Sequence, residues 1–418
     1  MTSTLQIDPS DPAGQLITNL RQLAELSSDE GGAQRVAWTD TWAAAREWYL
    51  GLLAELPVEV ERDEAGNIWA TLPGARPEAL IIGSHLDSVP GGGWLDGCLG
   101  VLAGLEVIRG LAAAGTPPLT VKLVDWADEE GARFGLSLIG SSAAAERIDP
   151  EFLRTLVDAD GITAPEALEA HGVDIASMPR AAARLRDAIA YLELHIEQGP
   201  VLEALGLPLA AVTGTYGVER WSVHFEGQSA HAGSTPMDRR RDALLSASRL
   251  ALEARELAVE LGGLSTVGRI DSAPGIATAL SGLAVAMIDQ RHTDGQALDD
   301  LHDGTRAAAT RIAEADGVTV SWNPIFRMRP LAFDASLVER AARIVAELQG
   351  DEARIPSGPL HDAVHIAGTG LPTVMLFVRS KRGLSHTREE DTDVADLALG
   401  LAALQRLADS VLAAHGQH

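Results

Sequence analysis

Hydrophobic positions along the first 216 residues recur alternately at helical and at strand spacing. Helical spacing covers residues 13–27, 35–55 and 99–115. Between these segments, "VEVERDEAGNIWATL" alternates around a turn and predicts a hairpin. Apolar runs that begin at Ala79, Leu119 and Tyr191 predict further strands, each of which ends in polar residues. This alternation predicts an α/β domain with a mostly parallel sheet covered by helices.

The pattern changes between residues 217 and 331, where strands and helices follow the order β-α-β-β-α-β. The expected strands are 219–227, 264–273, 282–292 and 318–326, and the expected helices are 238–261 and 297–317. This order predicts a small two-layer α+β domain with an antiparallel sheet, inserted as a lid or dimerisation domain. After residue 331 a helix (334–349), a strand (372–378) and a final helix (393–414) follow. The predicted domains are therefore 1–216 with 332–418, and 217–331.

Composition narrows the expected partners and location. The 418-residue chain carries a formal net charge of −26, so its surface repels nucleic acid and anionic membrane lipids. The single cysteine, Cys98, excludes internal disulfides and fits a reducing compartment. The N-terminal "MTSTLQIDPSDPAGQ" has neither the cationic nor the apolar region of a signal peptide, and the sequence has no apolar run of membrane-spanning length. We expect a soluble cytoplasmic protein.

Ionisable side chains gather where the predicted strands end. In a parallel sheet the carboxyl ends of the strands share one edge, so residues far apart in sequence converge there. A single histidine at such a position is more often a satisfied polar residue than a ligand, but the joint occurrence indicates a site. The candidates are His85, Asp87, Asp96, Glu129, Glu130, His195 and His386.

The mixture of imidazole and carboxylate groups, with no thiolate cluster, suits Zn²⁺, Mn²⁺, Co²⁺ or Ni²⁺. The candidates are numerous enough to hold two ions, and a carboxylate such as Asp96 can bridge ions ~3.5–4 Å apart. Asp87 follows His85 by two residues and can fix the tautomer of its ring. Glu129 and Glu130 are adjacent and point apart in an extended segment, so one can bind metal while the other accepts a proton from water.

Six segments occur in an order that resembles the M20-type metallohydrolases. They are "GSHLDSVPGGGWLDGCLGVLAGLEV", "DEEGARFG", "HIEQGPVLE", "GQSAHAGSTPM", "DQRH" and "GLSH". "HIEQGPVLE" followed by "AHAGSTPM" is typical of the amidase (hydantoinase/carbamoylase) branch, which includes N-carbamoyl-L-amino acid hydrolases and allantoate amidohydrolases. The resemblance extends from about residue 15 to about residue 410.

The resemblance implies a role for each matching position. His85, Asp96 and His195 would hold one ion, and Asp96, Glu130 and His386 would hold the other. Glu129 would be the general base, with Asp87 as the orienting group of His85. The substrate would be bound by Gln198, Arg291 and His231, of which His231 would also stabilise the oxyanion, commonly across a dimer interface.

Three segments depart from the branch pattern at four positions, which the resemblance implies to lie at or near the substrate. Thr278 replaces an asparagine, Pro359 and Leu360 replace small residues in "SGPLHDA", and Arg379 replaces a proline before the last metal ligand. The metal ligands and the base are retained. We therefore expect the chemistry to be kept and the substrate to differ.

The expected function is that of a binuclear metal-dependent amidohydrolase, in which Glu129 activates a water held between the ions. Its substrate would be a small N-carbamoyl (ureido) amino acid or related amide, with a carboxylate. An aminoacylase or dipeptidase acting through the same groups is the alternative. A binding protein without activity is disfavoured, because it would have no use for Glu129. The lid domain is expected to form a homodimer in which His231 serves the partner's site.

Overall fold

The computed structural model describes residue 8 and residues 11–416, so most of the segment in which no signal peptide is expected lies outside the described residues. The chain divides into two compact units. The first comprises Met1–Thr213 and Ala332–His418, and the second comprises Gly214–Leu331.

The first unit is built on a nine-stranded sheet with the order β13-β8-β15-β7-β5-β6-β4-β3, and β14 pairs with β8. The four inner strands β15, β7, β5 and β6 run parallel, whereas β8, β4 and β3 are antiparallel to their neighbours. The strands are β3 (Glu59–Arg62), β4 (Ile68–Leu72), β5 (Ala79–His85), β6 (Thr120–Trp126), β7 (Ala188–Ile196), β8 (Leu209–Thr215), β13 (Leu331–Ala332), β14 (Arg354–Ser357) and β15 (Thr373–Val378).

Helices cover this sheet, and the inner strands β5 and β15 are buried along their whole length. Such strands read as continuous apolar runs because both of their faces are covered. Helix α3 packs on β5, β6 and β7, and α12 packs on β15, β7 and α3. The main helices are α1 (Pro12–Ser27), α2 (Asp40–Leu53), α3 (Cys98–Ala114), α10 (Ala335–Gln349) and α12 (Val394–His415).

Short elements that the sequence pattern did not predict occur in the chain segment between β6 and β7 and in several other connections of the first unit. They are α4 (Ile139–Ala144), α5 (Pro150–Leu153), α6 (Ala164–Ala170), the 3-10 helix η1 (Met178–Leu185), α7 (Val201–Leu205), α11 (Asp362–Ala367), the 3-10 helix η3 (Lys381–Gly383) and the small pair β1 (Ser28–Asp29) and β2 (Gly32–Ala33). Helices α4 and α11 contact each other, and α11 also contacts β7 and β15.

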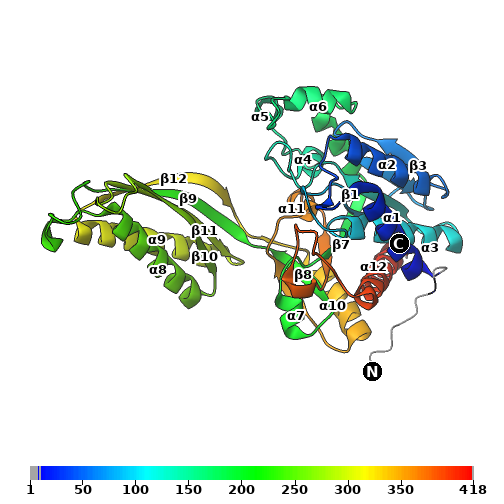
Figure 1. Ribbon diagram of the computed structural model, residues 1–418. Coiled ribbons are helices and arrows are strands. Elements are labelled where there is room, and N and C mark those ends of the chain that lie inside the picture. Colours follow the sequence, from blue (N-terminus) through cyan, green and yellow to red (C-terminus); the bar gives the residue numbers. More distant parts are fainter. Residues whose placement is uncertain (1–7, 9–10, 417–418) are drawn as a thin grey trace. The chain divides into compact units, whose positions relative to one another are not determined.

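The second unit has the predicted order of elements. It consists of β9 (Gly217–Glu226), the 3-10 helix η2 (Met237–Arg239), α8 (Ala243–Leu261), β10 (Leu264–Ala273), β11 (Leu283–His292), α9 (Gly295–Asp316) and β12 (Thr319–Met328). The sheet is antiparallel with the order β10-β11-β9-β12, and α8 and α9 pack on one face of it (Figure 1). Alternate residues of β11, namely Ala284, Ala286 and Ile288, are buried in its core. The α/β class with an inserted α+β domain is thus confirmed.

The chain passes between the units at two neighbouring strands. Strand β13 lies beside β8 in the first sheet. The N–H of Phe333 donates to the carbonyl of Thr213 at 3.0 Å, so the chain returns beside the point where it left.

One described helix, α12, is long and apolar enough to cross a membrane, with a mean hydropathy of 1.4 over its most apolar window. Half of that window is buried, and the helix packs against α10, α3, α1 and strands β7 and β15. These contacts are those of a core helix.

Candidate metal centre

The two strand-borne histidines lie at the carboxyl ends of neighbouring parallel strands. His85 is the last residue of β5, and His195 is the penultimate residue of β7. Both side chains are buried, and their rings are stacked with centroids 5.8 Å apart. Gly97, with φ 67°, keeps this space open, because a Cβ there would lie 2.4 Å from the His85 ring. The loop after β5 therefore closes tightly over the two rings.

Asp96 directs its two carboxylate oxygens toward different groups of ligands. Oδ1 lies 3.2 Å from Nε2 of His195 and 3.9 Å from Nε2 of His85. Oδ2 lies 3.3 Å from Nε2 of His386, which is itself 3.4 Å from Oε2 of Glu130. The five predicted ligands thus form two groups that share Asp96, and the ligand atoms of each group lie within 4.8 Å of one another.

Glu129 and Glu130 do not lie in an extended segment, contrary to what was expected for them. Strand β6 ends at Trp126, and Asp128 takes a left-handed backbone conformation with φ 60°. The chain therefore turns before the two glutamates. Their side chains still diverge, since Oε2 of Glu129 lies 3.8 Å from Nε2 of His85 while Oε2 of Glu130 faces His386.

Asp87 contacts both the histidine and the two glutamates. Nδ1 of His85 lies 3.2 Å from the main-chain oxygen of Asp87 and 3.6 Å from its carboxylate. The two carboxylate oxygens accept the main-chain N–H groups of Glu129 (3.2 Å) and Glu130 (3.1 Å). Asp87 thus contacts the His85 ring and also binds the main chain of the turn that carries the glutamates.

Burial and neighbouring charges shift the pKa values of these groups. Burial raises the pKa of Glu129 well above its usual value, and the charge of His85 only partly offsets this. Burial, with the negative charge of Asp96, raises the pKa of Glu130 to about 7. Burial opposes ionisation of Asp96, but hydrogen bonds from His195 and His386 hold its pKa well below the usual value. The hydrogen bond with Asp96 raises the pKa of His386 to about 9.

A cavity of about 210 Å³ opens beside these groups. Gln198 lines it and donates from Nε2 to Oδ2 of Asp96 (2.8 Å) and to Oγ of Ser385 (3.1 Å). Pro359 and Leu360, two of the positions that depart from the branch pattern, line it as well. Its lining residues are Asp96, Glu129, Glu130, Ser137, Gln198, Pro359, Leu360, His361 and His386.

His361 is a site residue that the sequence analysis did not single out. Its ring centroid lies 4.2 Å from that of His195, and its Nε2 is buried without a hydrogen-bond partner. Burial lowers the pKa of His361 well below its usual value, which keeps the ring neutral. Its place in "SGPLHDA", directly after Leu360, is the signal from which it could have been found.

Three further predicted site residues belong to the second unit. His231 is exposed and forms a bridge with Ala279, and the carbonyl of the exposed Thr278 accepts the N–H of Ala232 (2.9 Å). Arg291 lies near the other end of β11, where Nε donates to Oδ1 of Asp289 at 2.8 Å. His231 and Thr278 are therefore neighbours, whereas Arg291 is distant from both within this unit.

Arg379 does not take part in the metal centre, although its position in the sequence is close to that of His386. Its guanidinium donates to Asp396 (2.7 Å) and Asp393 (3.3 Å) at the start of α12. The replacement of proline by arginine at this position thus adds an ion pair to the helix terminus.

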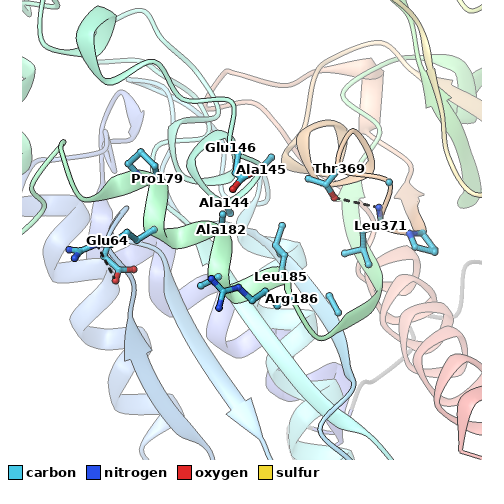
Figure 2. A pocket seen from close by; sticks show the side chains of 15 residues that line it. Glu64, Ala144, Ala145, Glu146, Pro179, Ala182, Leu185, Arg186, Thr369 and Leu371 are labelled. Carbon is cyan, nitrogen blue, oxygen red and sulfur yellow. Dashed lines mark hydrogen bonds and ion pairs between the residues drawn. The ribbon is translucent and has the colours of Figure 1, made fainter.

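A larger cavity of about 880 Å³ lies elsewhere in the first unit, as Figure 2 shows. Its lining includes Glu64, Glu146, Arg186 and Leu371, and none of the candidate site residues. Ala188, the first residue of β7, belongs to it, so the cavity lies near the amino ends of the parallel strands. Sites in such sheets form at the carboxyl ends, which are occupied by the groups described above.

The residues of the candidate centre suit divalent metal ions. Each group combines imidazole nitrogen with carboxylate oxygen, the donor set of Zn²⁺ and similar ions. Oε1 of Glu130 is buried without a hydrogen-bond partner, as expected of a group that needs a cation. The geometry therefore fits two ions held by His85, Asp96 and His195, and by Asp96, Glu130 and His386.

Comparison with known proteins identifies the family. Residues 81–410 match the peptidase family M20/M25/M40. The chain belongs to this family. It is 33% identical to an N-carbamoyl-L-amino-acid amidohydrolase of Paenarthrobacter aurescens over 400 residues, 94% of this chain and 97% of that protein. It is 32% identical to the allantoate amidohydrolase of Escherichia coli over 403 residues, 93% and 97% of the two chains.

Among solved structures, this M20 chain is similar to a hydantoinase/carbamoylase family amidase from Burkholderia multivorans. The TM-score is 0.86 at 34% sequence identity, and the match covers 97% of this chain and 98% of that one. The resemblance to the amidase branch inferred from the six sequence segments is thus confirmed.

Proposed function

We propose that the protein is a binuclear metal-dependent amidohydrolase that cleaves a linear C–N bond of a small N-carbamoyl amino acid or related amide. The division of the Asp96 oxygens between two ligand groups carries this proposal, because a shared carboxylate is what a two-ion centre requires. The names of the relatives, which act on N-carbamoyl amino acids and allantoate, support the substrate class.

Each group of the chain has a task in this reaction. Two divalent ions bound at the centre would acidify a water molecule and polarise the substrate carbonyl. Glu129 would accept a proton from that water at Oε2 and return it to the leaving nitrogen. Asp87 would hold His85 and the Glu129 main chain in place. His231 would donate to the oxygen that becomes negative, and Arg291 would bind the substrate carboxylate.

We further propose that His231 acts in the active site of a partner subunit. His231 pairs with Ala279, just before β11 begins at Leu283, whereas Arg291 is near the far end of that strand. Eight residues of extended strand separate Leu283 from Arg291 by roughly 25 Å. A small amide acid is too short to contact both ends of one lid, so two lids would have to contribute to each site.

The alternative substrate class is an N-acyl amino acid or a dipeptide. Pro359 and Leu360 line the cavity beside the metal centre and present a larger apolar surface than the small residues typical of the branch. Such a lining would suit an acyl group better than a polar ureido group.

The single cysteine, Cys98, is buried, which is compatible with the cytoplasmic location that we propose.

A panel of substrates tests the function. Purified protein would be stripped with chelator, reloaded with Mn²⁺, Zn²⁺, Co²⁺ or Ni²⁺, and offered N-carbamoyl, N-formyl, N-acetyl and dipeptide forms of the same amino acids. We expect no turnover without metal and ammonia release from the carbamoyl compounds after reloading. Amine release from acetyl or dipeptide substrates alone would favour the alternative, and full activity of metal-free protein would refute both.

A further inference from the structure

Glu390 is a buried carboxylate that none of the roles described above uses. It is 2% exposed and follows His386 by four residues. Its Oε1 accepts two main-chain N–H groups, those of Leu95 and Asp96, each at 3.0 Å. Glu390 thus reaches across 294 residues of sequence to the loop that carries the shared ligand.

The second oxygen of Glu390 contacts the other side of the centre. Oε2 lies 2.9 Å from Oγ of Ser385, the residue directly before His386. The same Oγ lies 3.1 Å from Oδ2 of Asp96 and accepts from Nε2 of Gln198 at 3.1 Å. One carboxylate therefore joins the loop of Asp96 to the loop of His386, both by its own bonds and through Ser385.

The loop before Asp96 is shaped around this carboxylate. A Cβ at Gly93 would lie 2.2 Å from the carboxyl group of Glu390, so no larger residue fits there without displacing it. Loss of the carboxylate would leave two buried N–H groups without acceptors, and the loop would have to move to satisfy them. Movement of the Asp96 main chain would change the distance between Asp96 and His386.

We propose that Glu390 is a positioning residue that fixes the separation of Asp96 and His386, and so sets the affinity of the centre for its ions. This inference rests on the proposed two-ion centre. Glu390 acts through main-chain groups and through Ser385, and it is not itself a ligand or a base. Groups that hold metal ligands in place typically contribute 10–100-fold to metal affinity.

Four variants test the proposal. Glu390→Ala removes both acceptors, and Glu390→Asp keeps the charge but is one methylene too short to reach both N–H groups. Glu390→Gln keeps an oxygen for the two N–H groups and offers its NH₂ to Ser385. Glu389→Ala is the matched control, since Glu389 is the exposed neighbour and its carboxylate accepts from Arg382 at 3.0 Å.

Two measurements are made on each variant: Mn²⁺ affinity of the metal-free protein by titration, and hydrogen–deuterium exchange of the Leu95 and Asp96 amides in metal-free protein. For Glu390→Ala and Glu390→Asp we expect faster amide exchange and Mn²⁺ binding weakened ~10–100-fold. For Glu390→Gln and Glu389→Ala, the Mn²⁺ affinity and the amide exchange rates should both stay within about threefold of the wild-type values. This change is smaller than the one expected when a positioning group is lost.

Wild-type Mn²⁺ affinity in Glu390→Asp would overturn the proposal, even if Glu390→Ala failed to fold. The proposal would also be overturned if Glu390→Gln bound Mn²⁺ as weakly as Glu390→Asp while its Leu95 and Asp96 amides stayed protected from exchange. The charge of Glu390, and not the position of the loop, would then decide the Mn²⁺ affinity. If wild-type protein bound none of Mn²⁺, Zn²⁺, Co²⁺ and Ni²⁺, the two-ion function would fail. Amide exchange would still report whether Glu390 holds the loop.

Discussion

Four carboxylates around the candidate centre are of two kinds: two face the metal ligands, and two bind main-chain groups beside them. Glu129 and Glu130 belong to the first kind, with their Oε2 atoms directed at His85 and His386. Asp87 and Glu390 belong to the second, and each accepts two consecutive main-chain N–H groups. The two kinds should respond differently to removal of charge.

Adjacent glutamates offer the most direct comparison. We expect Glu129→Gln to keep both ions but to lower turnover by ~10²–10⁴, the contribution of a general base. Glu130→Gln should lose one ion, because the amide is a weaker ligand than the carboxylate. Metal content by elemental analysis and ammonia release on the same samples measure both effects. Normal turnover of Glu129→Gln would contradict the assignment of the base.

His365 provides a stability prediction away from the ligands. It lies on α11, with Nδ1 3.4 Å from Oγ of Ser141. Burial, and then the charge of Arg147, lowers the pKa of His365 to about 4. The unfolded chain, with a histidine pKa near 6.5, binds this proton more readily. The free energy of unfolding should therefore fall as the pH drops from about 6.5 to about 4, by up to ~3 kcal/mol from this group.

Replacing His365 with glutamine removes this proton-linked contribution. Denaturant unfolding of metal-free protein between pH 5 and 7 should show a smaller loss of stability on acidification in His365→Gln than in the wild type. Using chelated samples keeps proton-linked metal release out of the comparison. Equal pH dependence in the two proteins would show that His365 is not the responsible group.

The ligands could be found from the sequence because His85 and His195 end apolar runs, a pattern that reports the edge of a sheet. The other three ligands, Asp96, Glu130 and His386, stand in the loops that follow such runs. Glu390 could not, since "TREED" has the composition of a solvated turn and its function depends on main-chain N–H groups 294 residues away. His361 follows the short strand β14 rather than a long apolar run, which gave no comparable signal.

At the scale of elements, long amphipathic helices and alternating strands were predicted with their order, while their ends were set by local chemistry. The helix expected at 35–55 begins at Asp40, because the Thr39 side chain accepts the N–H of Trp42 and caps it. The helix expected at 238–261 begins at Ala243, where Asp242 is the cap. Helices α4, α5 and α6 have four to seven residues, too few for a periodic pattern to emerge.

Helix α8 carries an apolar stripe that a second copy of the chain could cover. Leu245, Leu252 and Val259 are spaced by seven residues and are 52%, 64% and 75% exposed. We predict that Leu252→Lys with Val259→Lys gives a monomer. Its activity should fall ~10²-fold or more, because His231, the oxyanion donor that we propose to act in the partner's site, would then be missing from that site.

Sedimentation analysis and ammonia release measure these two outcomes. Leu205→Lys is the matched control, since Leu205 is 55% exposed on α7 of the first unit and should be neutral. A doubly substituted protein that remains dimeric and active would place the dimer interface elsewhere.

At the scale of the whole molecule, the proposed sharing of sites can be tested by mixing two inactive proteins. In a mixed dimer of His231→Ala and Glu129→Gln chains, one site lacks both groups and the other has both. Activity should therefore return on subunit exchange to as much as half of the wild-type value per mixed dimer. If exchange is confirmed with tagged chains and no activity appears, His231 acts within its own chain or has no role.

The pairing of Thr213 with Phe333 has a consequence for engineering the chain. Because the two residues are already hydrogen-bonded at 3.0 Å, the two ends of the first unit between which the second unit is inserted are adjacent. We therefore expect that the insert can be removed without disturbing the first sheet. Rejoining the chain there with a few glycines closes a gap of about one strand spacing, ~4.8 Å, at little entropic cost. We expect the first unit, once the insert has been removed, to fold, to bind its full complement of Mn²⁺ and to be a monomer without hydrolytic activity. Calorimetric titration of this shortened protein with Mn²⁺ would show whether the first unit binds metal without the second unit.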